Sequence, residues 1–197
     1  MNNVLVEFFS KYITLTPEEE NAIKNLNIIK VYPKNTLLLK EGQITDKGFL
    51  VLKGCIRVFF NIDGEEKTTE IYTEMEAICP ACTFNNLPSE YNIDCLENSI
   101  IAVGDSEMGN KINEQFPRFE TVCRLASEEQ LLQSQFSINS FKIHSPEKRY
   151  KLLQDARPDL IQRVPQNIIA SYLGITPQSL SRIRARMKNN KEKMAVV

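Results

Sequence analysis

The 197-residue sequence contains no tryptophan, a single histidine and seven glycines that stand singly along the chain. A metal-dependent barrel enzyme of the cupin type uses two or three histidine ligands, which His144 alone cannot supply. The scattered glycines form no phosphate-cradling loop, and no serine or cysteine has a histidine base within its own part of the chain. We therefore expect neither enzyme activity nor a bound cofactor.

Long hydrophobic runs are also absent. No apolar run approaches the length of a membrane span, and the start, MNNVLVEFFSKY, lacks the basic residues and the small-residue cleavage site of a signal peptide. Five cysteines, an odd number without an export signal, are expected to be thiols rather than a disulfide framework. These features predict a cytoplasmic protein with no membrane partner.

The net charge of −1 hides an uneven distribution. Residues 141–197 hold 12 Lys and Arg against 4 Asp and Glu, whereas residues 1–140 hold 12 against 21. The chain is thus an acidic body of net −9 joined to a basic segment of net +8. A basic segment of this kind attracts the phosphate backbone of nucleic acid.

The basic segment contains VPQNIIASYLGITPQSLSRIRARM, residues 164–187, whose pattern predicts two helices around a glycine turn. Pro165 suits the first position of a helix, and Gly174 suits the left-handed position that closes it. Thr176 and Pro177 then provide an N-cap and a first helical residue. The apolar residues that can pack the two helices together are Ala170, Leu173, Leu180 and Ile183. This is the helix-turn-helix arrangement.

The outer face of the second helix is polar and carries Gln178, Ser179, Ser181, Arg182 and Arg186. These side chains can donate hydrogen bonds to base edges or to phosphates. The alternative is a plain αα-hairpin, which the bare pattern fits equally well. The net +8 of the segment favours nucleic-acid binding.

Between residues 28 and 105 the pattern changes to that of strands. Seven short runs rich in β-branched and aromatic residues are separated by turn residues: IIKVY, TLLLK, GFLVLKG, CIRVFFNI, KTTEIYTE, YNIDCL and SIIAVGD. Asp63-Gly64 is the strongest hairpin signal. Seven or eight such strands predict an antiparallel barrel or jelly roll. Helices are expected before it, with Thr16 as a cap, and after it, from Asp105 or Ser106 to Gln115.

A long helix is predicted from Pro117 to about His144, with two apolar faces. One face holds Leu125, Leu132, Phe136 and Ile143; the other holds Phe116, Phe119, Cys123, Ala126, Leu131 and Ile138. One face can lie on the barrel and the other can meet the same helix of a second chain. The alternative is a helix enclosed between the chain's own two domains. The helix expected next, over residues 146–155 with Ser145 as its cap, would add Tyr150, Leu152 and Leu153 to a small C-terminal core.

This order of elements resembles the Crp/Fnr family of bacterial transcription regulators. The resemblance covers nearly the whole chain and is carried by TLLLKEGQITDKGFLVLKGCIRVFF, DGEEKTTEIYTE and the helix-turn-helix sequence. It implies an α+β fold with a jelly-roll, cyclic-nucleotide-binding-like barrel, a long dimerisation helix and a winged-helix-like C-terminal domain. The implied domains are residues 1–115 for the barrel with its N-terminal helices, 116–144 for the connecting helix and 145–197 for the DNA-binding part.

The resemblance also implies a homodimer that places one recognition helix per subunit in successive major grooves of near-palindromic double-stranded DNA. By position in the motif, the expected base readers are Gln178, Ser179 and Arg182, and the expected backbone contacts are Thr176, Ser181 and Arg186. RNA polymerase and an unknown small-molecule effector are the further partners that it implies. Many family members continue into a β-hairpin wing, whereas here KNNKEKMAVV follows, which we expect to be a frayed basic tail.

The barrel departs from the cyclic-AMP binders of the family, which hold the ribose and phosphate with a Gly-Glu pair and a later Arg-Ser or Arg-Thr pair. The corresponding stretch, EMEAICPACTFNNLPSEYNIDCLEN, has no glycine, no arginine and five carboxylates. A buried phosphate without a cationic partner is strongly disfavoured. We therefore expect the barrel either to bind a molecule other than cyclic AMP or only to hold the dimer together.

The same stretch contains a Cys-x-x-Cys pair, Cys79 and Cys82. Such a pair can ligate zinc or an iron–sulfur cluster, or cycle as a disulfide. Cluster-binding relatives carry their ligands mostly near the N-terminus, and this chain has no cysteine before Cys55. No metal is therefore expected, and a thiol- or metal-based redox sensor using this pair is the alternative interpretation. A further alternative is a small-molecule sensor or interaction module that does not bind DNA.

Overall fold

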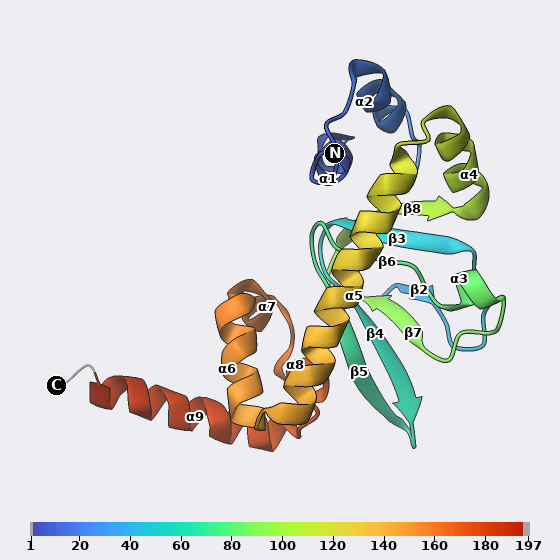
Figure 1. Ribbon diagram of the computed structural model, residues 1–197. Coiled ribbons are helices and arrows are strands. Elements are labelled where there is room, and N and C mark those ends of the chain that lie inside the picture. Colours follow the sequence, from blue (N-terminus) through green and yellow to red (C-terminus); the bar gives the residue numbers. More distant parts are fainter. Residues whose placement is uncertain (1, 195–197) are drawn as a thin grey trace.

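The computed structural model describes residues 2–194 and consists of a β-barrel, a long helix lying along it and a group of C-terminal helices (Figure 1). Within these residues the barrel has eight strands: β1 (Ile29–Tyr32), β2 (Leu37–Leu39), β3 (Lys47–Lys53), β4 (Ile56–Ile62), β5 (Glu65–Tyr72), β6 (Ala77–Ile78), β7 (Asn92–Cys95) and β8 (Ser99–Asp105). They form two four-stranded antiparallel sheets in the orders β1-β8-β3-β6 and β2-β7-β4-β5. The predicted jelly-roll barrel is confirmed.

Seven of the strands lie where the sequence pattern placed them, and the hairpin between β4 and β5 turns at the expected dipeptide. Asp63 and Gly64 have φ values of 52° and 81°, the positive values that a type I′ turn requires at both positions. β6 was not predicted, because two residues carry no periodic signal. The same holds for α3 (Cys82–Asn85), a single helical turn.

Apolar side chains from both sheets fill the interior of the barrel. Its buried members include Leu39, Phe49, Val51, Ile56, Val58, Ile78, Cys82, Ile93, Cys95 and Ile101. Because one face of each strand points inward, this packing fixes the register of the strands.

Three helices pack against the opposite face of the β1-β8-β3-β6 sheet: α1 (Asn2–Ser10), α2 (Pro17–Lys24) and α4 (Ser106–Gln115). α2 begins with the expected cap, because the Thr16 hydroxyl accepts a hydrogen bond from the amide of Glu19 at 3.2 Å and the Glu19 carboxylate accepts one from the amide of Thr16 at 2.8 Å. Asp105 caps α4 in the same way through the amide of Met108 at 2.9 Å. The core under these helices includes Leu5, Phe8, Ile23, Leu50, Leu52 and Ala102.

The long helix α5 (Phe119–Ile143) starts two residues later than predicted and is buried only in its first half. Phe119 and Val122 are buried in the N-terminal core, and Ala126 packs against it. Beyond this point the helix extends past the barrel to the C-terminal helices (Figure 1). Of the face predicted to hold Phe116, Phe119, Cys123, Ala126, Leu131 and Ile138, the structure buries Phe119 and partly buries Phe116 and Ala126, whereas Cys123, Leu131 and Ile138 are exposed within the single chain.

Four further helices follow: α6 (Pro146–Ala156), α7 (Pro158–Arg163), α8 (Gln166–Tyr172) and α9 (Pro177–Met194). Ser145 caps α6 as expected, and Tyr150 and Leu153 join the core, but Leu152 is 37% exposed and not the core residue we predicted. Pro165 is the N-cap of α8 rather than its first residue. α9 stays helical to Met194, so the expectation of a frayed tail is wrong up to that residue, and no wing strand follows among the described residues.

The C-terminal helices do not form an isolated core. Their buried residues, including Leu160, Ile168, Ile169 and Leu180, share one cluster with three residues of the barrel: Cys55, Ile71 and Leu96. Ser171 of α8 also accepts a hydrogen bond from the amide of Thr68 in β5 at 2.9 Å. The helix-turn-helix is thus seated on the edge of the barrel. No helix within residues 2–194 is long and apolar enough to cross a membrane.

Candidate nucleic-acid interface

The turn between α8 and α9 requires a glycine at position 174. Gly174 has φ of 66°, and a Cβ at this position would lie 2.6 Å from the Phe141 ring. The turn is closed by the amide of Ile175, which donates to the carbonyl of Ala170 at 3.0 Å. Both the backbone conformation and the space therefore exclude a larger side chain here.

α9 begins as the sequence predicted. The Thr176 hydroxyl accepts a hydrogen bond from the amide of Ser179 at 3.2 Å and donates one to the Ser179 hydroxyl at 3.0 Å. Ser179, expected to read bases, is half-buried and takes part in this cap. Its first role is to hold the start of the helix.

Two buried side chains orient α9. Leu180 and Ile183 are 1% and 3% exposed and pack into the cluster shared with α8, as predicted. Because residues three apart lie on one face of a helix, the opposite face points to solvent. That face carries Gln178, Ser181 and Arg182, all exposed. Among the described residues no hydrogen bond or ion pair holds the Arg182 guanidinium.

Arg186, one turn further along α9, is also exposed but has a partner within the chain. Its Nη2 lies 3.5 Å from the Glu147 carboxylate of α6, and both side chains are largely in solvent. Exposed pairs of this kind contribute at most about 1 kcal/mol. A phosphate can therefore compete for Arg186 at little cost.

Three other arginines of the basic segment are committed to internal contacts. Arg149 donates to the carbonyls of His144 at 3.0 Å and Leu173 at 2.8 Å. Arg157 donates to Thr73 Oγ1 and to Glu76 Oε2, each at 2.8 Å. The third, Arg163, donates to both carboxylate oxygens of Glu74. Some of the positive charges behind the net +8 of the segment are therefore not available to DNA. Counting charges in the sequence could not show this.

The acidic stretch of the barrel has partners that the sequence pattern did not identify. Glu74 and Glu76, in the loop between β5 and β6, are neutralised by Arg163 and Arg157 of the C-terminal helices. These contacts hold the pKa of Glu74 below its usual value despite its partial burial. The start of the stretch that was compared with the family's cyclic-AMP site thus binds two guanidinium groups of its own chain.

The two thiols of the Cys-x-x-Cys pair face different surroundings. Cys82 is buried in the barrel interior, whereas Cys79 is exposed beside α5. Although much of the residue is exposed, neighbouring atoms partly desolvate the thiol of Cys79 and raise its pKa, which disfavours the thiolate needed for metal binding or disulfide exchange. Within residues 2–194, no three His, Cys, Asp or Glu side chains are grouped to hold a metal ion. The pair therefore does not form a converging ligand set.

Comparison with known proteins identifies the fold. Residues 29–110 match the cyclic nucleotide-binding domain family. No curated protein matches the chain. Among solved structures, a CooA mutant from Carboxydothermus hydrogenoformans is 22% identical with a TM-score of 0.66, over 82% of this chain and 76% of that one.

Two other solved structures are similar over most of their length. FixK2 from Bradyrhizobium japonicum is 11% identical with a TM-score of 0.67, over 83% of this chain and 85% of that one. The c-di-GMP-responsive regulator CLP from Xanthomonas campestris is 12% identical with a TM-score of 0.63, over 95% and 92%. These neighbours are Crp/Fnr-family regulators, and the resemblance seen in the sequence is confirmed at the level of the fold.

Proposed function

We propose that this chain, which carries a cyclic nucleotide-binding-type barrel in a Crp/Fnr-like fold, is a homodimeric regulator of transcription that binds specific DNA sequences. The observation that carries the proposal is the exposed face of α9, where Gln178, Ser181 and Arg182 point away from the core that Leu180 and Ile183 anchor. A helix held in this way by a preceding helix can enter the major groove.

Arg182 has the chemistry of a specific base contact. A guanidinium can bond O6 and N7 of one guanine together, and such a pair discriminates between bases by about 1–3 kcal/mol. Gln178 can pair with adenine in the same bidentate manner. Thr176, Ser181 and Arg186 lie toward the ends and sides of this face and are assigned to the phosphate backbone, while Ser179 supports the cap and stays a candidate for base contact.

Dimerisation is supported by an apolar stripe on α5. Leu132, Phe136 and Ile143 are 56%, 74% and 71% exposed. Exposing apolar side chains to water is unfavourable, and a surface helix normally avoids it by keeping its outer side polar. A second α5 can cover this stripe in an isologous contact. Two recognition helices would then meet half-sites one helical turn apart.

The barrel is not assigned to cyclic AMP. Its interior is filled with apolar side chains, and Arg57, which lies on β4 near the acidic stretch, already pairs with Asp94 at 2.9 Å and with Glu66 at 2.6 Å. No arginine or lysine occurs between residues 74 and 98. A cyclic phosphate would therefore find carboxylates without a free cation.

Selection of bound sequences from random DNA tests the proposal. We expect a near-palindromic motif with half-sites one turn apart, and an affinity for it that falls steeply as salt is added. An interaction module that does not use DNA would enrich no motif. Binding without sequence preference would refute the assignment of α9 as a base reader.

A further inference from the structure

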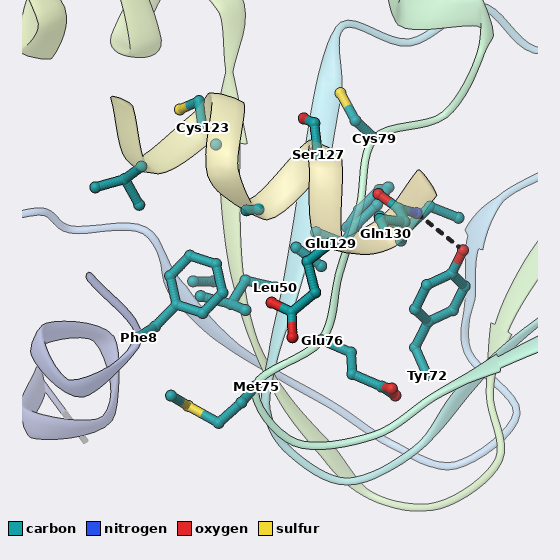
Figure 2. A pocket seen from close by; sticks show the side chains of 18 of the residues that line it. Phe8, Leu50, Tyr72, Met75, Glu76, Cys79, Cys123, Ser127, Glu129 and Gln130 are labelled. Carbon is teal, nitrogen blue, oxygen red and sulfur yellow. Dashed lines mark hydrogen bonds between the residues drawn. The ribbon is translucent and has the colours of Figure 1, made fainter. Parts of the chain in front are cut away.

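A cavity of about 470 Å³ lies between α1, α5 and the strands β3, β6 and β8 (Figure 2). We propose that it binds a neutral, largely aromatic small molecule, and that this molecule is the effector of the regulator proposed above. The cavity lies on the helix-covered side of the sheet, where Leu50, Ala77 and Ala102 contribute to the wall. It therefore lies mainly outside the filled space between the two sheets, although Phe49, Tyr72 and Ile78 of the barrel-interior cluster also line it. Its size falls within the range of small-molecule sites.

The walls are apolar and rich in aromatic rings and sulfur. α1 contributes Phe8 and Phe9, Tyr12 follows two residues after this helix, and Phe84 of α3 lines the cavity with 78% of its surface exposed. Sulfur atoms come from Met75, Cys79 and Cys123 (Figure 2). Aromatic rings and sulfur make favourable contacts with a flat aromatic ligand.

The charges around the cavity argue against an anion. Lys11 is the one cation that lines it among the described residues, and its ammonium already pairs with Glu129 at 2.6 Å. The hydroxyl of Tyr12 donates to the same carboxylate at 2.7 Å. The second lining acid, Glu76, is held by Arg157. A carboxylate or phosphate ligand would have to displace one of these partners, whereas a neutral ligand would not.

Polar groups of α5 can orient such a ligand. Ser127, Gln130 and Gln133 line the cavity from one side of this helix. The side-chain amide of Gln130 donates to the Tyr72 hydroxyl at 3.2 Å (Figure 2). A few hydrogen-bonding groups in a mainly apolar wall are typical of sites that select one orientation of a ligand.

The same cavity touches the contact that seats the C-terminal helices. Glu76 lines the cavity and binds Arg157, and its neighbour Met75 lines it as well. A ligand that moves this loop changes the position of α6 and α7 relative to the barrel, and with them the helix-turn-helix. This step rests on the proposed function, whereas binding in the cavity does not.

The uncharged fluorophore N-phenyl-1-naphthylamine tests the site on the full-length protein. Its emission rises in apolar surroundings, so we expect a saturable increase with one site per chain. Ala126 lines the cavity and is partly buried. Ala126→Phe fills the space and is expected to weaken binding at least about tenfold. The matched control, Ala156→Phe, places the same ring at an exposed position outside the cavity and should bind as the natural chain does.

A second variant covers the case in which Ala126→Phe fails to fold. Phe84→Ala removes a ring that is mostly in solvent, and we expect about threefold weaker binding without loss of stability. The site is overturned if the natural chain gives no saturable signal or if a folded Ala126→Phe chain binds the dye normally. It is also overturned if only the dimerisation-deficient Phe136→Glu chain binds the dye, because a second copy would then occupy the cavity in the natural dimer. Each of these results with normal operator binding would leave the DNA-binding proposal standing.

Discussion

The guanidinium of Arg163, at the end of α7, binds both carboxylate oxygens of Glu74, in the β5–β6 loop, at 2.8 and 2.9 Å. The same guanidinium donates to the carbonyl of Gly54 at 2.8 Å and to the Glu97 carboxylate. Two planar groups that meet in this way fix an orientation as well as a distance. The contact therefore joins the C-terminal helices of the basic segment to the barrel of the acidic segment.

We predict that Arg163→Ala lowers the free energy of unfolding by about 2 kcal/mol, because the Glu97 carboxylate and the Gly54 carbonyl lose the guanidinium donor and Glu74 keeps only the amide of Gly54. Urea denaturation measures the loss. Arg184→Ala, which removes an exposed arginine of α9, is the control and should change stability by less than about 0.5 kcal/mol. Combining Arg163→Ala with Glu74→Gln should cost less than the sum of the two. Strict additivity would show that the pair is not coupled.

Arg182→Ala is predicted to relax sequence preference at one base pair per half-site, because the bidentate contact to a guanine is lost. Lys188→Ala, further along the same helix, should instead lower affinity for all sequences alike and reduce the salt dependence. Titration of the selected operator and of random DNA at several salt concentrations separates the two effects. Equal losses on both DNAs for Arg182→Ala would contradict its role as a base reader.

Much of this fold follows from local signals in the sequence. The strands are marked by short runs of β-branched and aromatic residues between turn residues. The turn at Asp63-Gly64 and the caps at Thr16, Asp105 and Ser145 are set by residues within four positions. Gly174 marks its turn because φ there must be positive. Such features depend on neighbours in the chain, which is why they could be read without a structure.

The remaining features depend on contacts between distant segments. Nothing near Arg163 in sequence indicates that it binds Glu74, 89 residues away. α7 was missed because its six residues are too few for a periodic pattern. Helical spacing placed Leu131 and Ile138 on one apolar face of the long helix, but spacing does not show which residues of that face contact the barrel and which stay exposed in the single chain. The roles assigned to the exposed residues of α9 stay predictions.

Replacing Phe136 of α5 by Glu is predicted to give a monomer, because a charge at the centre of the exposed apolar stripe would have to be buried in the dimer. Light scattering after gel filtration should give twice the chain mass of 22.6 kDa for the natural protein and that mass for the variant. The control is Ile44→Glu, which changes a barrel residue with 54% exposure that lies outside the stripe. A dimeric Phe136→Glu chain would place the interface elsewhere.

Alkaline pH is predicted to weaken the contact between the barrel and the C-terminal helices through Cys55. This thiol is 1% exposed in the cluster that joins them, and burial raises its pKa from 9.0 to about 12. The folded chain therefore keeps the proton up to about pH 12, while the unfolded chain releases it near pH 9. The contribution of Cys55 is complete below pH 9 and is lost as the pH rises from 9 towards 12.

Urea denaturation between pH 7 and 11 measures this effect. The thiol alone should lower the free energy of unfolding by up to about 1.4 kcal/mol for each pH unit above 9. Cys55→Ala loses packing equally at every pH, so its offset at pH 7 serves as the reference, and its alkaline slope should be shallower. Some slope should persist, because burial also raises the pKa of Cys95 to about 11. Parallel curves for the two chains would mean that Cys55 ionises in the folded state as readily as in the unfolded one.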